Sequence, residues 1–273
     1  MIRDITIGQY YPTTSKIHTL DARLKLVATF LFIFSIFMVH SFTGYFYIVL
    51  SLGLVILQSK VPLKYMLKGI KSIMVIIVFT AILNIFMYHG ETILFQFSFV
   101  TITLEGLIMA FKMCFRLIIL IIGSSVLTLT TTPIQLTDGI EYLLRPLKPI
   151  GVPAHEIAMM MTIALRFIPT LLDETDKIMK AQQARGADFE SGGLMERAKS
   201  LIPILVPLFI SAFRRAEELA MAMEARCYHG DSGRTRMKPM QFQKLDYIGI
   251  FILVCYTVGI FALRYLEVIY TLI

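Results

Sequence analysis

The sequence predicts an all-α membrane protein, built as a small transmembrane helix bundle plus long helices that carry most of the charge. Of its 273 residues, 56% are hydrophobic and only 16% are charged, and the mean hydropathy is +0.72. Soluble domains hold about 25% charged residues. The apolar residues gather in continuous runs, whereas residues 131–245 contain most of the charges. These observations together favour a membrane bundle joined to a more polar helical region.

Five apolar runs are long enough to cross a membrane, since a span needs roughly 17–25 mostly apolar residues. With their flanks they predict spans near residues 24–40, 42–58, 72–89, 106–129 and 246–265. The chain therefore divides into three parts. Residues 1–130 hold the first four spans, residues 131–245 form a cytoplasmic or interfacial helical domain, and residues 246–273 hold the last span.

The basic residues alternate between the loops of this layout. They occur before the first span, between the second and third, and after the fourth. The segments between the first and second spans and from Tyr88 to Thr103 contain no Lys or Arg. Because basic loops remain cytoplasmic, we expect the N-terminus inside and, after five spans, the C-terminus outside the cell.

The external segment TILFQFSFVTITLEG, residues 92–106, partly alternates with a period of two and is rich in β-branched and aromatic residues. Such a pattern is typical of strands. A short hairpin and a simple apolar loop both fit it.

Two long helices are expected in the polar region. The first starts near Pro153 and runs to Arg185, and Gly186 follows it as glycine often follows a helix. The second runs from about Leu194 to Arg226, with apolar residues recurring every three or four positions. A shorter helix precedes them, beginning at Pro133 because proline suits the first helical position.

Both long helices end in an Ala-Arg pair. Arg185 and Arg226 are 41 residues apart, in AQQARGAD and AMEARCYHG. An arginine at a helix C-terminus interacts favourably with the helix dipole, which would explain either one alone. Two matching ends with small neighbours also suit a partner surface with two matching sockets, since a guanidinium forms forked bonds with carboxylates.

The residues around these ends resemble a known family. The stretch from TLTTTP through EYLLRPLKPIGVPAHEIAMMMTIALRFIPTLLDETDKIMKAQQARGAD, with ELAMAMEARCYHGDSGRTR after it, is similar to the transmembrane T component of energy-coupling factor (ECF) transporters, the CbiQ-like family. The resemblance covers nearly the whole chain and is most specific in residues 128–188 and 217–236.

The resemblance implies a transmembrane domain with long cytoplasmic coupling helices, in a prokaryotic cell membrane. It also implies two X-Arg-X motifs, usually Ala-Arg-Gly, that seat in two ABC-type ATPase subunits. The motif residues here are Ala184, Arg185, Gly186, Ala225, Arg226 and Cys227. The second motif has Cys227 where the family usually has glycine.

The resemblance further implies a membrane-embedded S component that captures a vitamin or metal ion and is moved by the coupling helices. Nine of the 16 methionines lie in residues 153–240. Methionine suits surfaces that repack against different partners, although ordinary core packing explains any single one equally well. Possible S-component contacts are Met159, Met160, Met161, Met221 and Met223.

Other function classes find little support. No G-x-x-x-x-G-K-[ST] motif is present, so the chain is not expected to be the ATPase, and no cofactor, metal site or catalytic residue is expected. A self-contained secondary transporter or channel is the alternative, but five spans do not divide into two equal repeats.

Two charged residues fall inside the fourth predicted span. Lys112 and Arg116 share one helical face. They could line a polar path or pair with Glu105 or a partner. Alternatively, both lie near the interface with their charged ends snorkelling to water.

Overall fold

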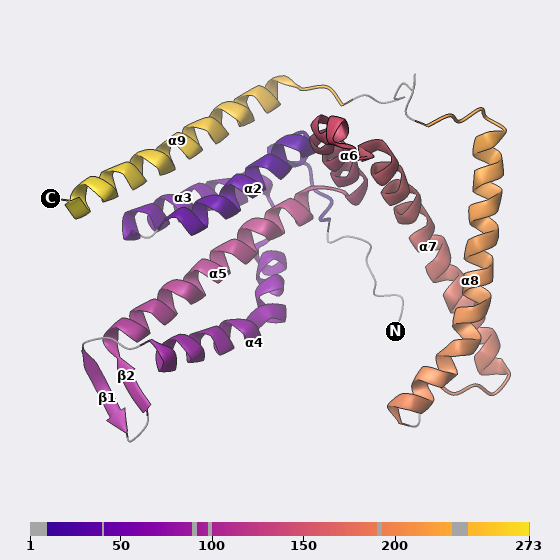
Figure 1. Ribbon diagram of the computed structural model, residues 1–273, viewed down its shortest axis with the longest axis horizontal. Helices are drawn as coiled ribbons and strands as arrows, with labels where there is room; N and C mark the ends of the chain where they lie inside the picture. The colour runs from indigo at the N-terminus through magenta and orange to yellow at the C-terminus, as the bar shows by residue number, and fades with distance from the viewer. Residues whose placement is uncertain are drawn as a thin grey trace. The chain divides into compact units, whose positions relative to one another are not determined.

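The computed structural model describes residues 10–39, 41–88, 92–97, 100–189, 193–230 and 240–272. Its contacts divide the chain into two compact units. We call Gly8–Gly139 with Met240–Ile273 the bundle unit, and Ile140–Pro239 with Met1–Ile7 the paired-helix unit. Each is described by itself (Figure 1).

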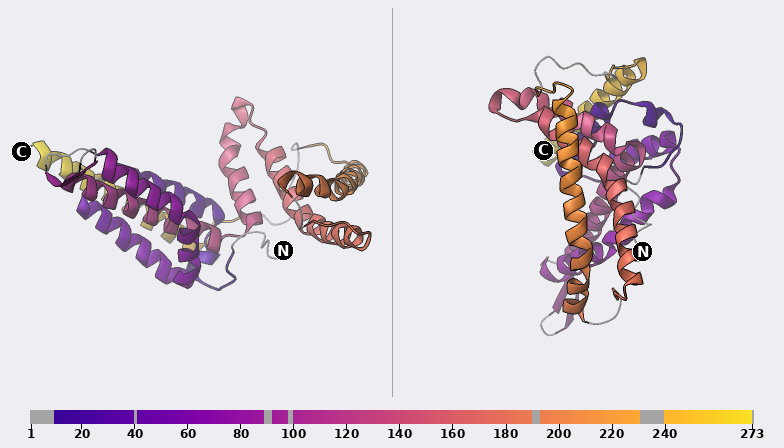
Figure 2. Two further views of the ribbon diagram at one scale, coloured as in Figure 1. Left: turned by 90° about the horizontal axis from the view of Figure 1, so that it is seen from below. Right: turned by 90° about the vertical axis from the view of Figure 1, so that its right-hand side faces the viewer.

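The bundle unit is built from five long helices. Their bounds are α2 Ala22–Met38, α3 Phe42–Ser59, α4 Leu63–Met87, α5 Leu104–Thr130 and α9 Lys244–Leu272. The helices lie side by side in Figures 1 and 2, with α5 against α2 and α4, and α9 against α2 and α3. A buried core that includes Ile36, Ile48, Met66 and Ile260 joins them. Most other apolar side chains face outward, as expected where lipid is the solvent.

Polar side chains start several of these helices. The Asp21 carboxylate accepts the Arg23 N–H at the start of α2, and the Ser41 hydroxyl accepts the Gly44 N–H at the start of α3. Thr103 caps α5 in the same way. Each cap satisfies an N–H that has no partner within its helix.

The spans expected from the sequence are all present as helices, with different ends. The third begins at Leu63 rather than near residue 72, so Lys64, Lys68 and Lys71 lie on α4 and not in a loop. The last extends to Leu272 instead of 265. Lysine and arginine are good helix formers, and charges at a span's end therefore do not stop the helix.

Length and composition select five described helices that could cross a membrane: α3, α4, α5, α9 and α7. Helix α7, Ala154–Ala184, is among them, which adds a candidate span within residues 131–245. The 17-residue α2 is not among them, although its length is at the lower limit for a span.

A β-hairpin connects α4 and α5. Strand β1, Ile93–Phe97, pairs antiparallel with β2, Val100–Thr103, in the register Phe97 to Val100 and Phe95 to Ile102. This confirms the hairpin rather than the apolar loop.

Glu105 and Arg116 both lie in the first half of α5. Arg116 donates from Nε and Nη2 to the Tyr45 hydroxyl, at 3.0 and 2.8 Å, and lies 3.5 Å from the Val39 carbonyl at the end of α2. Glu105 instead accepts from Thr92, so the suggested pair with Arg116 is wrong. Arg116 therefore reaches the α2–α3 turn, which favours the snorkelling interpretation.

A short helix precedes the bundle. Helix α1, Lys16–Thr19, holds His18, whose Nε2 donates to the Tyr11 carbonyl at 3.0 Å. Nδ1 therefore accepts from the Ser15 hydroxyl at 2.7 Å. Burial, opposed in part by the Tyr11 carbonyl, lowers the pKa of His18 below its ordinary value.

The paired-helix unit begins within α6, Pro133–Leu144, and includes a 3-10 segment η2, Arg145–Ile150. It consists mainly of α7 and of α8, Leu194–Glu224. Both long helices agree with the bounds expected from the sequence within two residues, and both run through internal prolines. The helix start at Pro133 is also confirmed.

Candidate functional site: two arginine helix ends

The first candidate site is the end of α7 around Arg185. The helix stops one residue before Arg185, and Gly186 is left-handed with φ +89°. The Gly186 N–H donates to the Gln183 carbonyl at 2.9 Å, and the Ala187 N–H donates to the Gln182 carbonyl at 3.0 Å. This pair of bonds is a Schellman motif, which satisfies the last carbonyls of a helix and turns the chain away.

The end of α8 repeats this geometry. Cys227 is left-handed with φ +54°, and its N–H donates to the Glu224 carbonyl at 2.8 Å. The Tyr228 N–H donates to the Met223 carbonyl at 3.1 Å. Each donor and acceptor lies 41 residues after its counterpart at the end of α7. Arg226 and Arg185 therefore hold equivalent positions, immediately before the left-handed residue.

Cys227 departs from the glycine of the first helix end but keeps its backbone geometry. It adopts the left-handed conformation that glycine adopts in α7. A side chain in this conformation costs roughly 1–2 kcal/mol, because Cβ approaches the next carbonyl oxygen. The helix end keeps its shape at that cost, so glycine is not required for the geometry itself.

Both arginines are open to a partner. All six motif residues, Ala184–Gly186 and Ala225–Cys227, are exposed. Within the described part of the chain, neither guanidinium makes a hydrogen bond, an ion pair or a ring contact. The helix dipole favours both positions, but the forked donor groups of both side chains are left for another molecule.

The two ends lie at opposite ends of the helix pair. Gln182, near the end of α7, donates to the Pro203 carbonyl early in α8, while Tyr228, after α8, donates to the Met159 sulfur early in α7. The helices are therefore antiparallel, as Figure 2 shows. Arg185 lies 26 residues beyond Met159, which is about 40 Å of helix.

An ion pair holds the middle of this pair of helices. Arg215 Nη2 lies 3.0 Å from Glu174 Oε2, and both side chains are partly exposed. Glu174 belongs to the DETD cluster, residues 173–176, which thus contributes to helix packing. Together with the contacts at the two ends, it connects α7 and α8 along much of their length.

The methionines proposed as partner contacts differ in exposure. Met160 and Met221 are each 62% exposed, whereas Met159, Met161 and Met223 are partly buried. Met159 contributes its sulfur to the Tyr228 contact described above. The two exposed side chains are the ones available to another protein.

The centre of α8 carries a larger apolar surface. Its apolar residues recur every three or four positions, yet between Leu201 and Phe213 only Ile204 is buried. Seven large apolar side chains are 47–66% exposed: Leu201, Ile202, Leu205, Val206, Phe209, Ile210 and Phe213. Exposed apolar patches of this kind mark contacts with proteins or lipid.

The described residues contain no group of three or more His, Cys, Asp or Glu side chains that could hold a metal ion. His155 Nδ1 lies 3.3 Å from Glu141 Oε1 and joins the start of α7 to the end of α6. His155 therefore contributes to the packing of α6 against α7.

A family model and the similar proteins found by comparison agree with one another. The family model described as CbiQ, cobalt transport protein, matches residues 13–238. The energy-coupling factor transporter transmembrane protein EcfT of Clostridium kluyveri is 59% identical over 262 residues, or 94% of this chain and 97% of the relative. The protein of the same name from Bacillus subtilis is 47% identical over 264 residues, covering 97% and 100%.

The match to the family model and the high identity over almost full length lead to one assignment. The chain belongs to the CbiQ family, as the transmembrane component of an energy-coupling factor transporter.

Proposed function

We propose that this chain couples ATP hydrolysis by two ABC-type ATPase subunits to the movement of a membrane-embedded S component that binds a vitamin or metal ion. The chain itself is a non-catalytic subunit. Arg185 and Arg226 each insert into a socket on one ATPase. The observation that carries this proposal is the repetition of one exposed arginine geometry at opposite ends of α7 and α8.

The chemistry of a socket follows from the arginine ends. Each guanidinium offers several N–H donors, so the socket supplies carboxylate or carbonyl acceptors. Small neighbours, Ala184 and Ala225, allow the partner's surface to approach each arginine. Two ends of the same shape, about 40 Å apart along the pair, suit a partner with two copies of the same socket.

The S component has an apolar surface available to it. The exposed centre of α8, with Met160 and Met221, offers flexible and apolar side chains to a membrane protein. ATP-driven closure of the ATPases moves the two arginine ends, and α7 and α8 transmit this movement to the S component. Residues 131–245 are the coupling domain in this proposal.

The orientation in the prokaryotic cell membrane follows from the basic residues. Lys60, at the end of α3, precedes three lysines on the first turns of α4. This basic end of the bundle faces the cytoplasm, with the N-terminus inside and the C-terminus outside. The alternative of a self-contained secondary transporter or channel is not favoured, because the close relatives are components of energy-coupling factor transporters.

The test is uptake by cells that express the chain with the ATPase pair and S component encoded in its genome. Labelled B vitamins and labelled Co²⁺ serve as substrates. The Arg185→Glu, Arg226→Glu double variant places like charge against each socket and should abolish uptake. The control replaces one exposed arginine on each helix away from its end, Arg166→Glu and Arg214→Glu. Normal uptake by the double variant would refute the proposal.

A further inference from the structure

The first turn of α2 differs from the rest of that helix. Ala22, Arg23, Leu24, Lys25 and Leu26 are all buried, at 5–8% exposure. Further along α2, Phe30, Phe34 and Phe37 are 54–65% exposed. A helical turn buried on every side must be packed against several other segments, and each of these five residues contacts one.

The first of these segments is the chain that leaves the bundle unit. Lys25 Nζ donates to the Thr130 carbonyl at the end of α5, at 3.0 Å. Gly139 is the last residue before the paired-helix unit. A Cβ atom on it would lie 2.9 Å from the Leu26 side chain and 3.4 Å from Ala22. The departing chain therefore lies directly against the first turn of α2.

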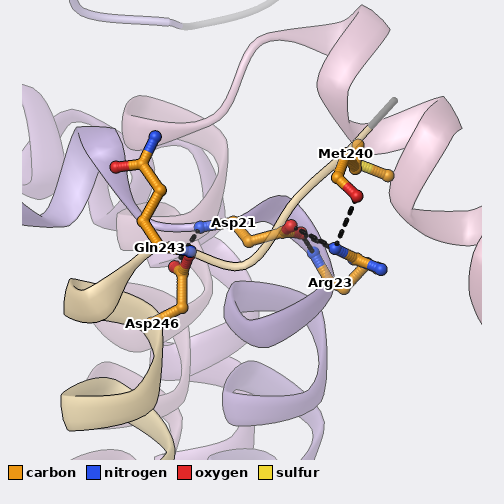
Figure 3. Close-up of polar contacts among 5 residues, drawn as sticks. All are labelled: Asp21, Arg23, Met240, Gln243 and Asp246. Atoms are coloured by element: carbon orange, nitrogen blue, oxygen red, sulfur yellow. Dashed lines mark hydrogen bonds and ion pairs between the residues drawn. The ribbon is translucent and has the colours of Figure 1, made fainter. Parts of the chain in front are cut away.

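The second segment is the chain that returns. Met240 is the first residue of the bundle unit after the paired-helix unit. Arg23 makes a long hydrogen bond, 3.5 Å, to the Met240 carbonyl, and its guanidinium lies 4.1 Å from the centre of the Phe242 ring. Figure 3 shows Arg23 held in this position by the Asp21 carboxylate, at 2.6 and 3.0 Å.

Asp246 completes the returning connection at the start of α9. Its side chain is 1% exposed, and its two carboxylate oxygens accept from the Asp21 N–H at 2.8 Å and the Gln243 N–H at 2.7 Å (Figure 3). Further along α9, the Leu24 side chain would lie 2.7 Å from a Cβ atom on Gly249. The buried cluster contains two carboxylates and two cations, so its charges balance.

We propose that Ala22–Leu26, with Asp21 and Asp246, is a junction anchor that holds both chain connections to the paired-helix unit at one place on the bundle. Asp246 and Arg23 are its positioning residues. The mechanical consequence rests on the proposed function: arginine ends pushed by ATPases transmit force only if the helices have a fixed attachment. A loose attachment would absorb the movement.

The anchor itself is tested on the full chain in lipid nanodiscs, without any partner. Spin labels are placed at two exposed positions of the bundle unit, Gln58 on α3 and Gln241 just before α9, after the native cysteines are replaced by serine. Double electron–electron resonance then gives the distribution of distances between the end of α3 and the returning chain. Asp246→Asn leaves one oxygen to accept two N–H groups, and should broaden the distribution because the returning chain loses one of the two bonds that hold it.

Tyr256→Phe is the matched control. It removes the hydrogen bond of 2.7 Å between Tyr256 and Ser35, which also joins α2 to α9 but lies outside the anchor. It should leave the distribution as narrow as in wild type, even where thermal unfolding shows a similar loss of stability. Phe242→Ala is a milder anchor variant should Asp246→Asn fail to fold, and it should also broaden the distribution.

Two results would overturn the anchor: equal widths in wild type and the anchor variants, or equal broadening by Tyr256→Phe. A narrow wild type that broadens only in the anchor variants supports it, whether or not the ATPases bind. Failure of the proposed function would show instead as uptake that is indifferent to Arg185 and Arg226.

Discussion

The two arginine ends offer a reciprocal pair of substitutions. Gly186→Ala places a side chain at a left-handed position, and Cys227→Gly removes one from the equivalent position. Apart from its chain neighbours, no atom of the described residues lies within 4 Å of a Cβ built on Gly186, so the alanine meets open space there. The effect of Gly186→Ala is therefore conformational strain alone.

The magnitude follows from the cost of a left-handed side chain, about 1 kcal/mol at the lower end of its range. Because 1.4 kcal/mol corresponds to a factor of ten, this is about a fivefold change in the equilibrium for opening the helix end. Gly186→Ala should open the end of α7 about fivefold more often. Cys227→Gly should open the end of α8 less often by a similar factor.

Hydrogen exchange measures these openings at the amides that close each motif. The Ala187 amide reports on α7 and the Tyr228 amide on α8, since each donates to a carbonyl five residues earlier. Each variant serves as the control for the other end, whose exchange should not change. Faster exchange at Tyr228 in Cys227→Gly would refute the reasoning, because it would mean that the cysteine stabilises the turn.

Three further predictions concern the rest of the chain. Since burial lowers the pKa of His18, the unfolded chain binds a proton first as the pH falls below 6.5, so thermal stability should fall from pH 7.5 to 5.5 and fall less in His18→Gln. Unchanged pH dependence in that variant would contradict this. Tyr45→Phe removes the acceptor of two Arg116 N–H groups and should cost about 1–3 kcal/mol in thermal unfolding. A negligible loss would mean that Arg116 finds water instead. Arg215→Ala breaks a partly exposed ion pair with Glu174 and should lower the free energy of unfolding by no more than about 1 kcal/mol. A larger loss of thermal stability would contradict the reasoning that solvent weakens this ion pair.

The sequence predicted the helices well because their signals are local. Pro133 marked a helix start, Gly186 a helix end, and the long apolar runs the spans of the bundle. Cys227 gave no such signal, because cysteine rarely takes a left-handed conformation. The family resemblance implied its equivalence to Gly186, and the hydrogen bonds give both residues the same geometry.

The features that the sequence did not reveal depend on contacts between distant segments. The opposite placement of Arg185 and Arg226 follows from the antiparallel contacts of α7 and α8, which no spacing encodes. The junction anchor joins Asp21 to Asp246, residues more than two hundred positions apart (Figure 3). Charged residues do occur at the start of both α2 and α9 in the sequence. We interpreted the basic ones only as part of the alternation of basic loops, and not as contacts between the two helices.

The central claim is that Arg185 and Arg226 bind two ATPase subunits. The most direct measurement is co-purification of the tagged chain with its ATPase pair. Three proteins are compared: wild type, the double variant that carries both Arg185→Ala and Arg226→Ala, and a control double variant that carries both Arg166→Ala and Arg214→Ala. Truncating one partner of a buried charged contact costs about 2–5 kcal/mol, or at least about thirtyfold in affinity. The account predicts that wild type and control retain both ATPases and the double variant loses them. Equal retention by all three would contradict it and leave the two arginines as helix-end residues.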